Sequence, residues 1–185
     1  MPEMTPKDAV FITGNQKKAE YLSRYLGHSV EHSKVELEEI QSLDLQEVVR
    51  HKVRQAYAQV GRPVLVEDVS LEFVALGRLP GTFIRWFQEE LSPAELCRLL
   101  DGKDRSAIAR CMFGYYDGMA EHYFEGELRG RVAEKPAGTD GFGWDSIFIP
   151  EGYDVTRAEL SEDDDRLTYL TLKPFTQIRT FLLGE

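Results

Sequence analysis

Cysteine and long apolar runs are both scarce in this sequence. Cys97 and Cys111 are isolated, without the density of a disulfide framework or the spacing of a metal site, so both are predicted to be reduced core residues. No stretch approaches the roughly 18 consecutive apolar residues of a membrane span, and no secretion signal opens the chain. We therefore expect a soluble, cytoplasmic protein without a membrane partner.

Positive charge is also in short supply. The chain has 22 lysines and arginines against 32 aspartates and glutamates, which gives a formal net charge of -10. Nucleic acids and anionic membranes require a basic face, so neither is expected as a partner. A small polyanion remains compatible with this charge, because it needs only a local cationic pocket and a divalent metal ion.

The composition predicts a globular fold. Hydrophobic residues make up 42% of the 185 residues, and no repeat, linker or low-complexity segment divides the chain. We expect a single domain over residues 1–185, with two lobes.

Residues 9–27 combine a buried strand, a short turn and a helix. The apolar run 9–12 predicts the strand, and apolar residues at helical spacing predict a helix that ends near Gly27. The turn between them, Thr13-Gly14-Asn15-Gln16-Lys17-Lys18, presents a helix N-terminus and two ammonium groups, which favour the binding of a phosphate chain. Ordinary helix capping has the same pattern, and the turn alone does not separate the two interpretations.

Three acidic positions favour metal-assisted phosphoryl chemistry. Glu67 and Asp68 follow the apolar strand 64–66 and are predicted to lie at its carboxyl end, where open α/β sheets bind ligands. Glu39 lies in the connector 36–41, and Lys52 lies toward the polar side of a helix predicted over 45–60. Carboxylates can hold Mg²⁺ and deprotonate water, while lysines neutralise phosphate. Solvated surface acids are the alternative, and for Glu39 alone the stronger one.

The other segments predict further elements around a sheet. We expect a strand over 29–35, a helix through Ile84–Phe87, a helix from Ser92 to Gly102, an antiparallel hairpin of strands 107–116 and 121–132, a strand over 147–149 and a terminal helix through 175–182. A glycine-rich loop, 138–143, precedes Trp144 and Asp145. Residues 162–165 form an acidic stretch for which no element is predicted.

Four stretches, in this order, resemble the inosine triphosphate pyrophosphatases, a family that hydrolyses aberrant purine nucleoside triphosphates. They are Thr13-Gly14-Asn15-x-x-Lys18, residues 64–71, residues 75–87 and residues 141–148. The resemblance spans most of the chain and implies an α/β fold with a long, mixed, twisted sheet flanked by helices and two lobes around a central cleft. It also implies hydrolysis of ITP, dITP and XTP to nucleoside monophosphate and pyrophosphate, with Mg²⁺, by a homodimer.

The resemblance further implies roles for individual residues. Asp68 is expected to be the general base and, with Glu39, a metal ligand. Phe142 and Trp144 are expected to wall the base pocket, with core packing as the alternative, and Asp145 is expected to accept from base or ribose, or else to cap the turn. The implied substrate contacts, in which the three cationic residues bind the triphosphate, are Thr13, Gly14, Asn15, Lys18, Lys52, Val69, Arg85, Phe142, Gly143, Trp144 and Asp145.

One stretch departs from the family pattern. The family has a lysine and then Ser-His-Arg near its C-terminus, and these side chains bind phosphate and the purine 6-oxo group. Here Asp165 stands at the lysine position, or Arg166 after a small shift, and Leu170 and Thr171 stand at the His-Arg pair. Because losing such donors weakens base discrimination, two alternatives are open. One is a pyrophosphatase for another modified nucleotide, and the other is a nucleotide-binding protein that has lost turnover.

Overall fold

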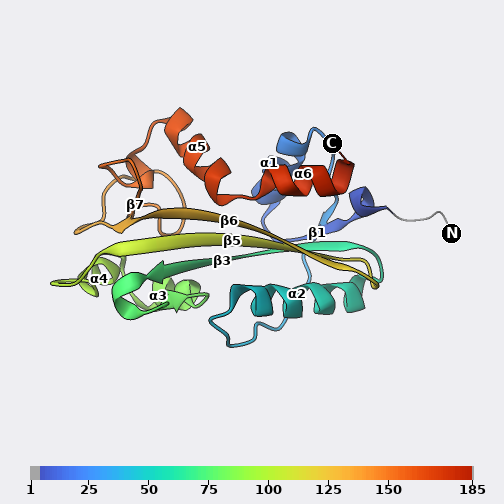
Figure 1. The fold of residues 1–185 in the computed structure, drawn as a ribbon, viewed down its shortest axis with the longest axis horizontal. Helices are drawn as coiled ribbons and strands as arrows, with labels where there is room; N and C mark the ends of the chain where they lie inside the picture. Colours follow the sequence, from blue (N-terminus) through green and yellow to red (C-terminus); the bar gives the residue numbers. More distant parts are fainter. Residues whose placement is uncertain (1–4, 185) are drawn as a thin grey trace. The chain divides into compact units, whose positions relative to one another are not determined.

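The computed structural model describes residues 5–184, which contain a mixed seven-stranded sheet with helices packed on it (Figure 1). The strands are β1 (Val10–Ile12), β2 (His32–Ser33), β3 (Val64–Phe73), β4 (Pro80–Gly81), β5 (Ser106–Tyr116), β6 (Glu121–Val132) and β7 (Phe148–Pro150). The α-helices are α1 (Gln16–Leu26), α2 (Leu45–Val60), α3 (Ile84–Glu90), α4 (Pro93–Arg98), α5 (Glu162–Leu172) and α6 (Phe175–Leu183). Short 3-10 helices span Pro6–Asp8, Val74–Leu76 and Arg157–Glu159.

The sheet has the strand order β2-β1-β3-β5-β6-β7, and β4 pairs with β3 off this path. β1 is parallel to β2 and β3, whereas β4 is antiparallel to β3 and β7 is antiparallel to β6. Only residues 117–120 join β5 to β6, too few for a parallel crossover. The predicted hairpin and the predicted mixed sheet are both confirmed.

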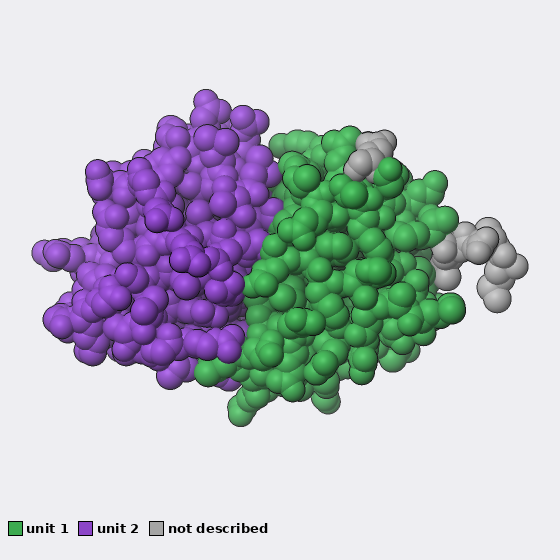
Figure 2. All heavy atoms as spheres, in the orientation of Figure 1, with its two compact units in different colours: residues 1–68, 112–125, 174–185 green, residues 69–111, 126–173 purple. Residues whose placement is uncertain are grey.

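The chain forms two compact units, coloured separately in Figure 2. Unit 1 comprises residues 1–68, 112–125 and 174–185, and unit 2 comprises residues 69–111 and 126–173. Within unit 1, α2 covers one face of the strands, and α1 and α6 cover the other (Figure 1). Within unit 2, α5 lies on one face, and α3 and α4 lie on the other (Figure 1). The single domain over 1–185 stays a prediction.

An apolar cluster between α2 and the strands holds unit 1 together. Its buried members are Val10, Ile12, Leu45, Val49, Val53, Ala56, Val64, Val66 and Met112. The helix residues recur every three to four positions, so one face of α2 is continuously apolar. Asp44 caps this helix by accepting from the backbone N–H groups of Gln46 and Glu47. The prediction that Lys52 lies toward the polar side of this helix is wrong: residue 52 is one turn from the buried Val49 and Ala56, and its side chain, only 14% exposed, reaches Asp68 on β3.

The strand predicted over 64–66 is too short at its C-terminal end. β3 continues to Phe73, because Leu71 and Phe73 bury their side chains and β4 pairs with residues 71 and 72. Glu67 and Asp68 therefore lie inside a strand rather than after it. The parallel partner β1 stops at Ile12, however, so the two acids lie just past the end of β1, beside the turn that begins at Thr13.

Three other boundaries differ from the predictions. The strand expected over 29–35 is reduced to His32–Ser33, and the helix expected to reach Gly102 ends at Arg98. The acidic stretch opens α5, which was not predicted. Ser161 caps this helix, and four acids in its first turn complement the helix dipole, a start signal present in the sequence.

Cys97 and Cys111 are buried and not disulfide bonded, as predicted. Across residues 5–184, no helix combines the length and apolarity needed to cross a membrane.

Candidate functional site

The turn before α1 is a capped helix N-terminus. Asn15 is the N-cap: its Oδ1 accepts from the backbone N–H of Lys18 at 3.4 Å, and its own N–H donates to Thr13 Oγ1 at 3.1 Å. The capping interpretation therefore holds, and it leaves phosphate binding by Thr13, Gly14 and Asn15 a prediction. Lys34, which the sequence did not single out, also lies here: a Cβ on Gly14 would be 3.3 Å from its Cδ. No local pattern signals this neighbour, because it follows β2.

Lys52 joins two of the predicted metal ligands. Its Nζ donates to Glu39 Oε1 at 3.2 Å and to Asp68 Oδ2 at 3.0 Å, and only 14% of its side chain is exposed. Burial acts to lower the pKa of Lys52, but the charges and hydrogen bonds of Asp68 and then Glu39 outweigh it, so the pKa is raised. An ammonium group thus sits between two carboxylates that come from the connector and from β3.

Lys18 belongs to a neighbouring ion pair. Its Nζ donates to Glu67 Oε1 at 3.2 Å, and the Glu67 side chain is only 5% exposed. Successive side chains of a strand point to opposite faces, so Glu67 and Asp68 leave β3 on different sides. α1 and α2 indeed lie on opposite faces in unit 1 (Figure 1). Lys18 and Asp68 therefore belong to two separate ion-pair clusters, Lys18–Glu67 and Glu39–Lys52–Asp68, whose acids Glu67 and Asp68 are consecutive residues of β3.

Arg85 and Val69 belong to unit 2. Arg85 Nε donates to Glu89 Oε1 one turn later in α3 at 2.9 Å, and its guanidinium lies 5.7 Å from the Trp86 ring centroid. Val69 follows Asp68 on β3 and is half-buried. For both residues, contact with the substrate stays a prediction.

A turn in unit 2 carries the predicted base-binding residues. Phe142 is 82% exposed, so core packing is the wrong alternative for this side chain. Trp144 is half-buried, and its indole N–H is buried without a hydrogen-bond partner among residues 5–184. Gly141 has a φ of +89°, and a Cβ there would lie 2.7 Å from Asp145 Cβ and Oδ2. The turn therefore requires glycine at this position.

Asp145 caps that turn. Its Oδ2 accepts from the backbone N–H of Phe142 at 2.7 Å, as the capping interpretation predicts. Its Oδ1 accepts from Arg157 NH1 at 2.9 Å. Burial raises the pKa of Asp145, and the charge of Arg157 opposes that shift. Both carboxylate oxygens are thus engaged by the protein, which leaves a contact with base or ribose a prediction.

Arg157 is a residue that sequence reasoning missed. It is buried, with 7% exposure, and its NH2 donates to Asp165 Oδ1 at 2.6 Å while its Nε donates to Thr168 Oγ1 at 3.1 Å. Asp165, at the position where the family has a lysine, is therefore the partner of an arginine from another segment. Arg166 is exposed and its NH2 lies 3.9 Å from Asp163 Oδ1, and its service in place of that lysine stays a prediction.

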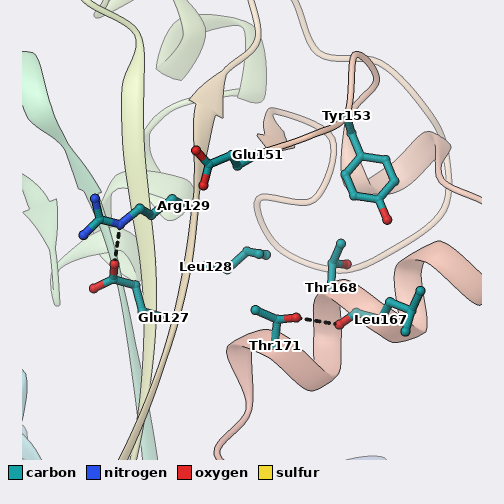
Figure 3. A pocket seen from close by; sticks show the side chains of 8 residues that line it. All are labelled: Glu127, Leu128, Arg129, Glu151, Tyr153, Leu167, Thr168 and Thr171. Atoms are coloured by element: carbon teal, nitrogen blue, oxygen red, sulfur yellow. Dashed lines mark hydrogen bonds and ion pairs between the residues drawn. The ribbon is translucent and has the colours of Figure 1, made fainter.

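A pocket of about 360 Å³ lies between β6 and α5 in unit 2 (Figure 3). Its lining residues are Glu127, Leu128, Arg129, Glu151, Tyr153, Leu167, Thr168 and Thr171. None of the predicted substrate contacts is among them. Thr171, at the family's arginine position, donates its hydroxyl to the backbone oxygen of Leu167 on its own helix at 2.9 Å (Figure 3). Its hydroxyl is thereby used locally.

Comparisons with known proteins agree with this fold. A sequence model described as the Ham1 family matches residues 9–168. Two Trypanosoma cruzi proteins named inosine triphosphate pyrophosphatase 2 and 1 are 44% and 43% identical over 160 residues, covering 83% of this chain and 81% of each relative.

Solved structures share the architecture. A Mycobacterium abscessus protein named as a nucleoside-triphosphatase, dITP/XTP pyrophosphatase, superposes with a TM-score of 0.76 at 27% identity, over 88% of this chain and 94% of that one. The Staphylococcus aureus Ham1 protein reaches a TM-score of 0.81 at 24% identity, over 95% and 98% of the two chains. These similarities confirm the predicted α/β fold class.

Proposed function

Because the chain belongs to the Ham1 family, we propose that it hydrolyses noncanonical purine nucleoside triphosphates, namely ITP, dITP and XTP, to nucleoside monophosphate and pyrophosphate. The names of the T. cruzi relatives and of the M. abscessus protein support this substrate class. The single observation that carries the proposal is the Glu39–Lys52–Asp68 cluster beside the Lys18–Glu67 pair.

The triphosphate is proposed to bind past the end of β1. Lys18 lies one turn into α1, whose N-terminal N–H groups and dipole favour an anion. Lys52 approaches from α2, and both lysines are proposed to reach one phosphate chain past Ile12, the last residue of β1. Each lysine would exchange its carboxylate partner for a phosphate oxygen, which is a charge-assisted hydrogen bond of the same kind.

The donor set around Lys52 fits a magnesium ion. Glu39 and Asp68 place hard carboxylate oxygens around one cation, the ammonium of Lys52, and Mg²⁺ in proteins is commonly held by one or two carboxylates plus water and substrate phosphates. Glu39 and Asp68 would hold the ion. When bound, it would neutralise phosphate charge and make the α-phosphorus more electrophilic.

Asp68 is proposed to be the general base. Its carboxylate takes a proton from a water molecule, whose oxygen forms a bond to the α-phosphorus. The bond between the α-phosphorus and the bridging oxygen breaks, and pyrophosphate leaves with that electron pair. Lys52, hydrogen-bonded to Asp68 at 3.0 Å, keeps the carboxylate oriented until the substrate arrives.

The purine is proposed to stack on the turn that carries Phe142 and Trp144. Phe142 is 82% exposed, so its ring has apolar area that a ligand can cover, and every purine offers a flat aromatic face for stacking. The buried indole N–H of Trp144 could donate to an acceptor on the ligand, which would satisfy it.

Pyrophosphate release from a nucleotide panel tests the proposal. Purified protein with Mg²⁺ should release pyrophosphate from ITP, dITP or XTP much faster than from ATP or GTP, and EDTA should stop it. Asp68→Asn and Glu39→Gln should abolish release, whereas Glu38→Gln, a matched change at the exposed neighbouring acid, should not. Full activity of Asp68→Asn would reject the assignment.

Leu170 and Thr171 stand where the family has the His-Arg pair, and the Thr171 hydroxyl already donates to Leu167 on its own helix. Because these positions lack the family's base-binding donors, two rival functions are tested as well. A damaged pyrimidine triphosphate as the best substrate in the panel would select a pyrophosphatase of different specificity. Tight nucleotide binding without metal-dependent hydrolysis would select a binding protein that has lost turnover.

We also propose a homodimer. Leu79 and Trp86 are large apolar residues of unit 2 that are substantially exposed, and covering them would remove apolar area from water. Sedimentation of the wild-type protein and of Trp86→Asp would test this, since a dimer through this surface should dissociate in the variant.

A further inference from the structure

One buried guanidinium ties the aromatic turn of unit 2 to α5. Arg157 donates to Asp145 in the turn at 2.9 Å, to Asp165 in the first turn of α5 at 2.6 Å and to Thr168 at 3.1 Å. The backbone N–H of Ala158 also donates to the backbone oxygen of Asp145. Arg157 therefore connects two segments that are separated by more than ten residues along the chain.

The conformation of the turn depends on this connection. Phe142 is exposed and gains little from packing, so its direction follows from its backbone, whose N–H is held by Asp145 Oδ2 at 2.7 Å. Gly138, Gly141 and Gly143 all have positive φ, so the loop is built from residues with wide conformational freedom. Without an anchored Asp145, this loop would sample many arrangements of its rings.

We propose that Arg157 is a positioning residue for nucleotide binding, which holds the Phe142–Trp144 turn through Asp145 while Asp165 holds Arg157. This inference rests on the proposed function, in which a purine stacks on that turn. A prearranged ring platform binds its ligand without a further ordering penalty, and loss of the arrangement weakens binding. The chemical step uses other residues, so the expected effect is on KM and not on kcat.

Asp165 gives the sharpest test, because a neighbouring residue is a matched control. Asp165 and Asp163 both lie in the acidic first turn of α5, and both are ion paired, but only Asp165 contacts Arg157. Asp165→Ala should raise KM for ITP about fivefold to tenfold, the effect of losing one oriented contact, with kcat within about twofold of wild type. Asp163→Ala should leave both constants unchanged.

Arg157 variants test the same contact from its other side. Arg157→Met should raise KM by more than Asp165→Ala, and Arg157→Lys should recover part of the loss, because an ammonium can still reach one carboxylate. Arg157→Met removes a buried partner of Asp145, so it can also fail to fold. The Asp165 side chain is 47% exposed in the wild type, so Asp165→Ala is expected to fold. That variant keeps the proposal testable in that case.

A readout without nucleotide separates this inference from the proposed function. In a Trp86→Phe background, Trp144 is the remaining tryptophan, and acrylamide should quench it more in Asp165→Ala than in Asp163→Ala. Equal quenching and equal KM in these two variants, with an active wild type, would overturn the inference alone. An inactive wild type would overturn the proposed function, and the quenching comparison would still decide whether Arg157 holds the turn.

Discussion

Replacing Lys52 by methionine removes the ammonium shared by Glu39 and Asp68 and keeps an unbranched apolar side chain at this position of α2. In the wild type, the Nζ lies 3.0 Å from Asp68 Oδ2 and 3.2 Å from Glu39 Oε1. The variant leaves two carboxylates facing each other without a cation. We therefore expect it to be less stable in the absence of metal.

The size of the loss follows from these distances and from burial. Two unit charges 3.0 Å apart attract by about 5.5 kcal/mol at an effective dielectric constant of about 20, and the pair is partly buried. Glu39 is more exposed, at 41%, so at 3.2 Å in water it adds only about 1 kcal/mol. Burying the ammonium costs several kcal/mol of desolvation, which cancels much of this attraction. The variant is therefore expected to lose about 2 to 3 kcal/mol of unfolding free energy. For a protein of this size, the melting temperature should fall by roughly 5 to 10 °C.

The pH dependence has a definite sign. The pKa of Lys52 is raised above its ordinary value of 10.5 in the folded protein, despite burial, by Asp68 and Glu39. A raised pKa means that the stabilisation is fully present below the unfolded value and is lost as pH rises through the folded value. The difference in melting temperature between wild type and Lys52→Met should thus be constant from neutral pH to about pH 9.5 and shrink above it.

Magnesium supplies a second arm of the same assay. On the proposed function, the ion would have to displace the ammonium from Glu39 and Asp68 in the wild type, whereas in Lys52→Met it would take the place that the ammonium leaves. At ten times the dissociation constant, bound Mg²⁺ adds about 1.4 kcal/mol of stability, so a given concentration should raise the melting temperature of the variant more.

Thermal unfolding with and without Mg²⁺, between pH 7 and pH 11.5, measures all three effects. Lys34→Met is the matched control, because Lys34 pairs with Glu36 at an exposed site and its loss should change stability little. Equal melting temperatures of wild type and Lys52→Met at pH 7, or equal stabilisation of both by Mg²⁺, would refute the reasoning.

Three further outcomes are expected. Phe142→Ala should leave the melting temperature unchanged, because the ring is exposed, yet weaken inosine nucleotide binding by about tenfold or more through lost stacking, measured by calorimetry; wild-type affinity would exclude stacking there. Lys18→Met should raise KM for the triphosphate about tenfold, the loss of one charge-assisted contact, and an unchanged KM would place the phosphates elsewhere. Gly114→Ala should destabilise by about 1 to 3 kcal/mol, because its Cβ would lie 2.5 Å from Val49 Cγ1. Adding Val49→Ala should recover part of that loss in urea unfolding, and additive losses would contradict the clash.

Local patterns were sufficient where a single segment decides the outcome. The strand at 10–12, the capped turn at Asn15 and the helix α2 follow from apolar spacing and capping residues within one stretch. The start of α5 carried the same kind of signal in Ser161 and the acids after it. The end of β3 did not, because β4 extends that strand through pairing with a segment farther along the chain.

Candidate site residues divide in the same way. The acids Glu39, Glu67 and Asp68 and the lysines Lys18 and Lys52 stand out as residue types suited to phosphate chemistry. Sequence spacing does not predict their partners. Lys52 pairs with Glu39 and Asp68, and Lys18 pairs with Glu67, because the pairing of β1 with β3 brings these segments together. The role of Arg157 could not be predicted, because no pattern in the sequence around it indicates that Asp145 and Asp165 are its partners.

By itself, the sequence determined the strand–turn–helix opening, the family resemblance and the residue types that suit a nucleotide hydrolase. Those features depend on the order and periodicity of neighbouring residues. Only the tertiary structure decided that the acids lie inside β3 past the end of β1, that one lysine joins Glu39 to Asp68, and that Arg157 anchors the aromatic turn. Charge interactions act over a few ångströms of space, and chain folding, not sequence distance, decides which groups come that close.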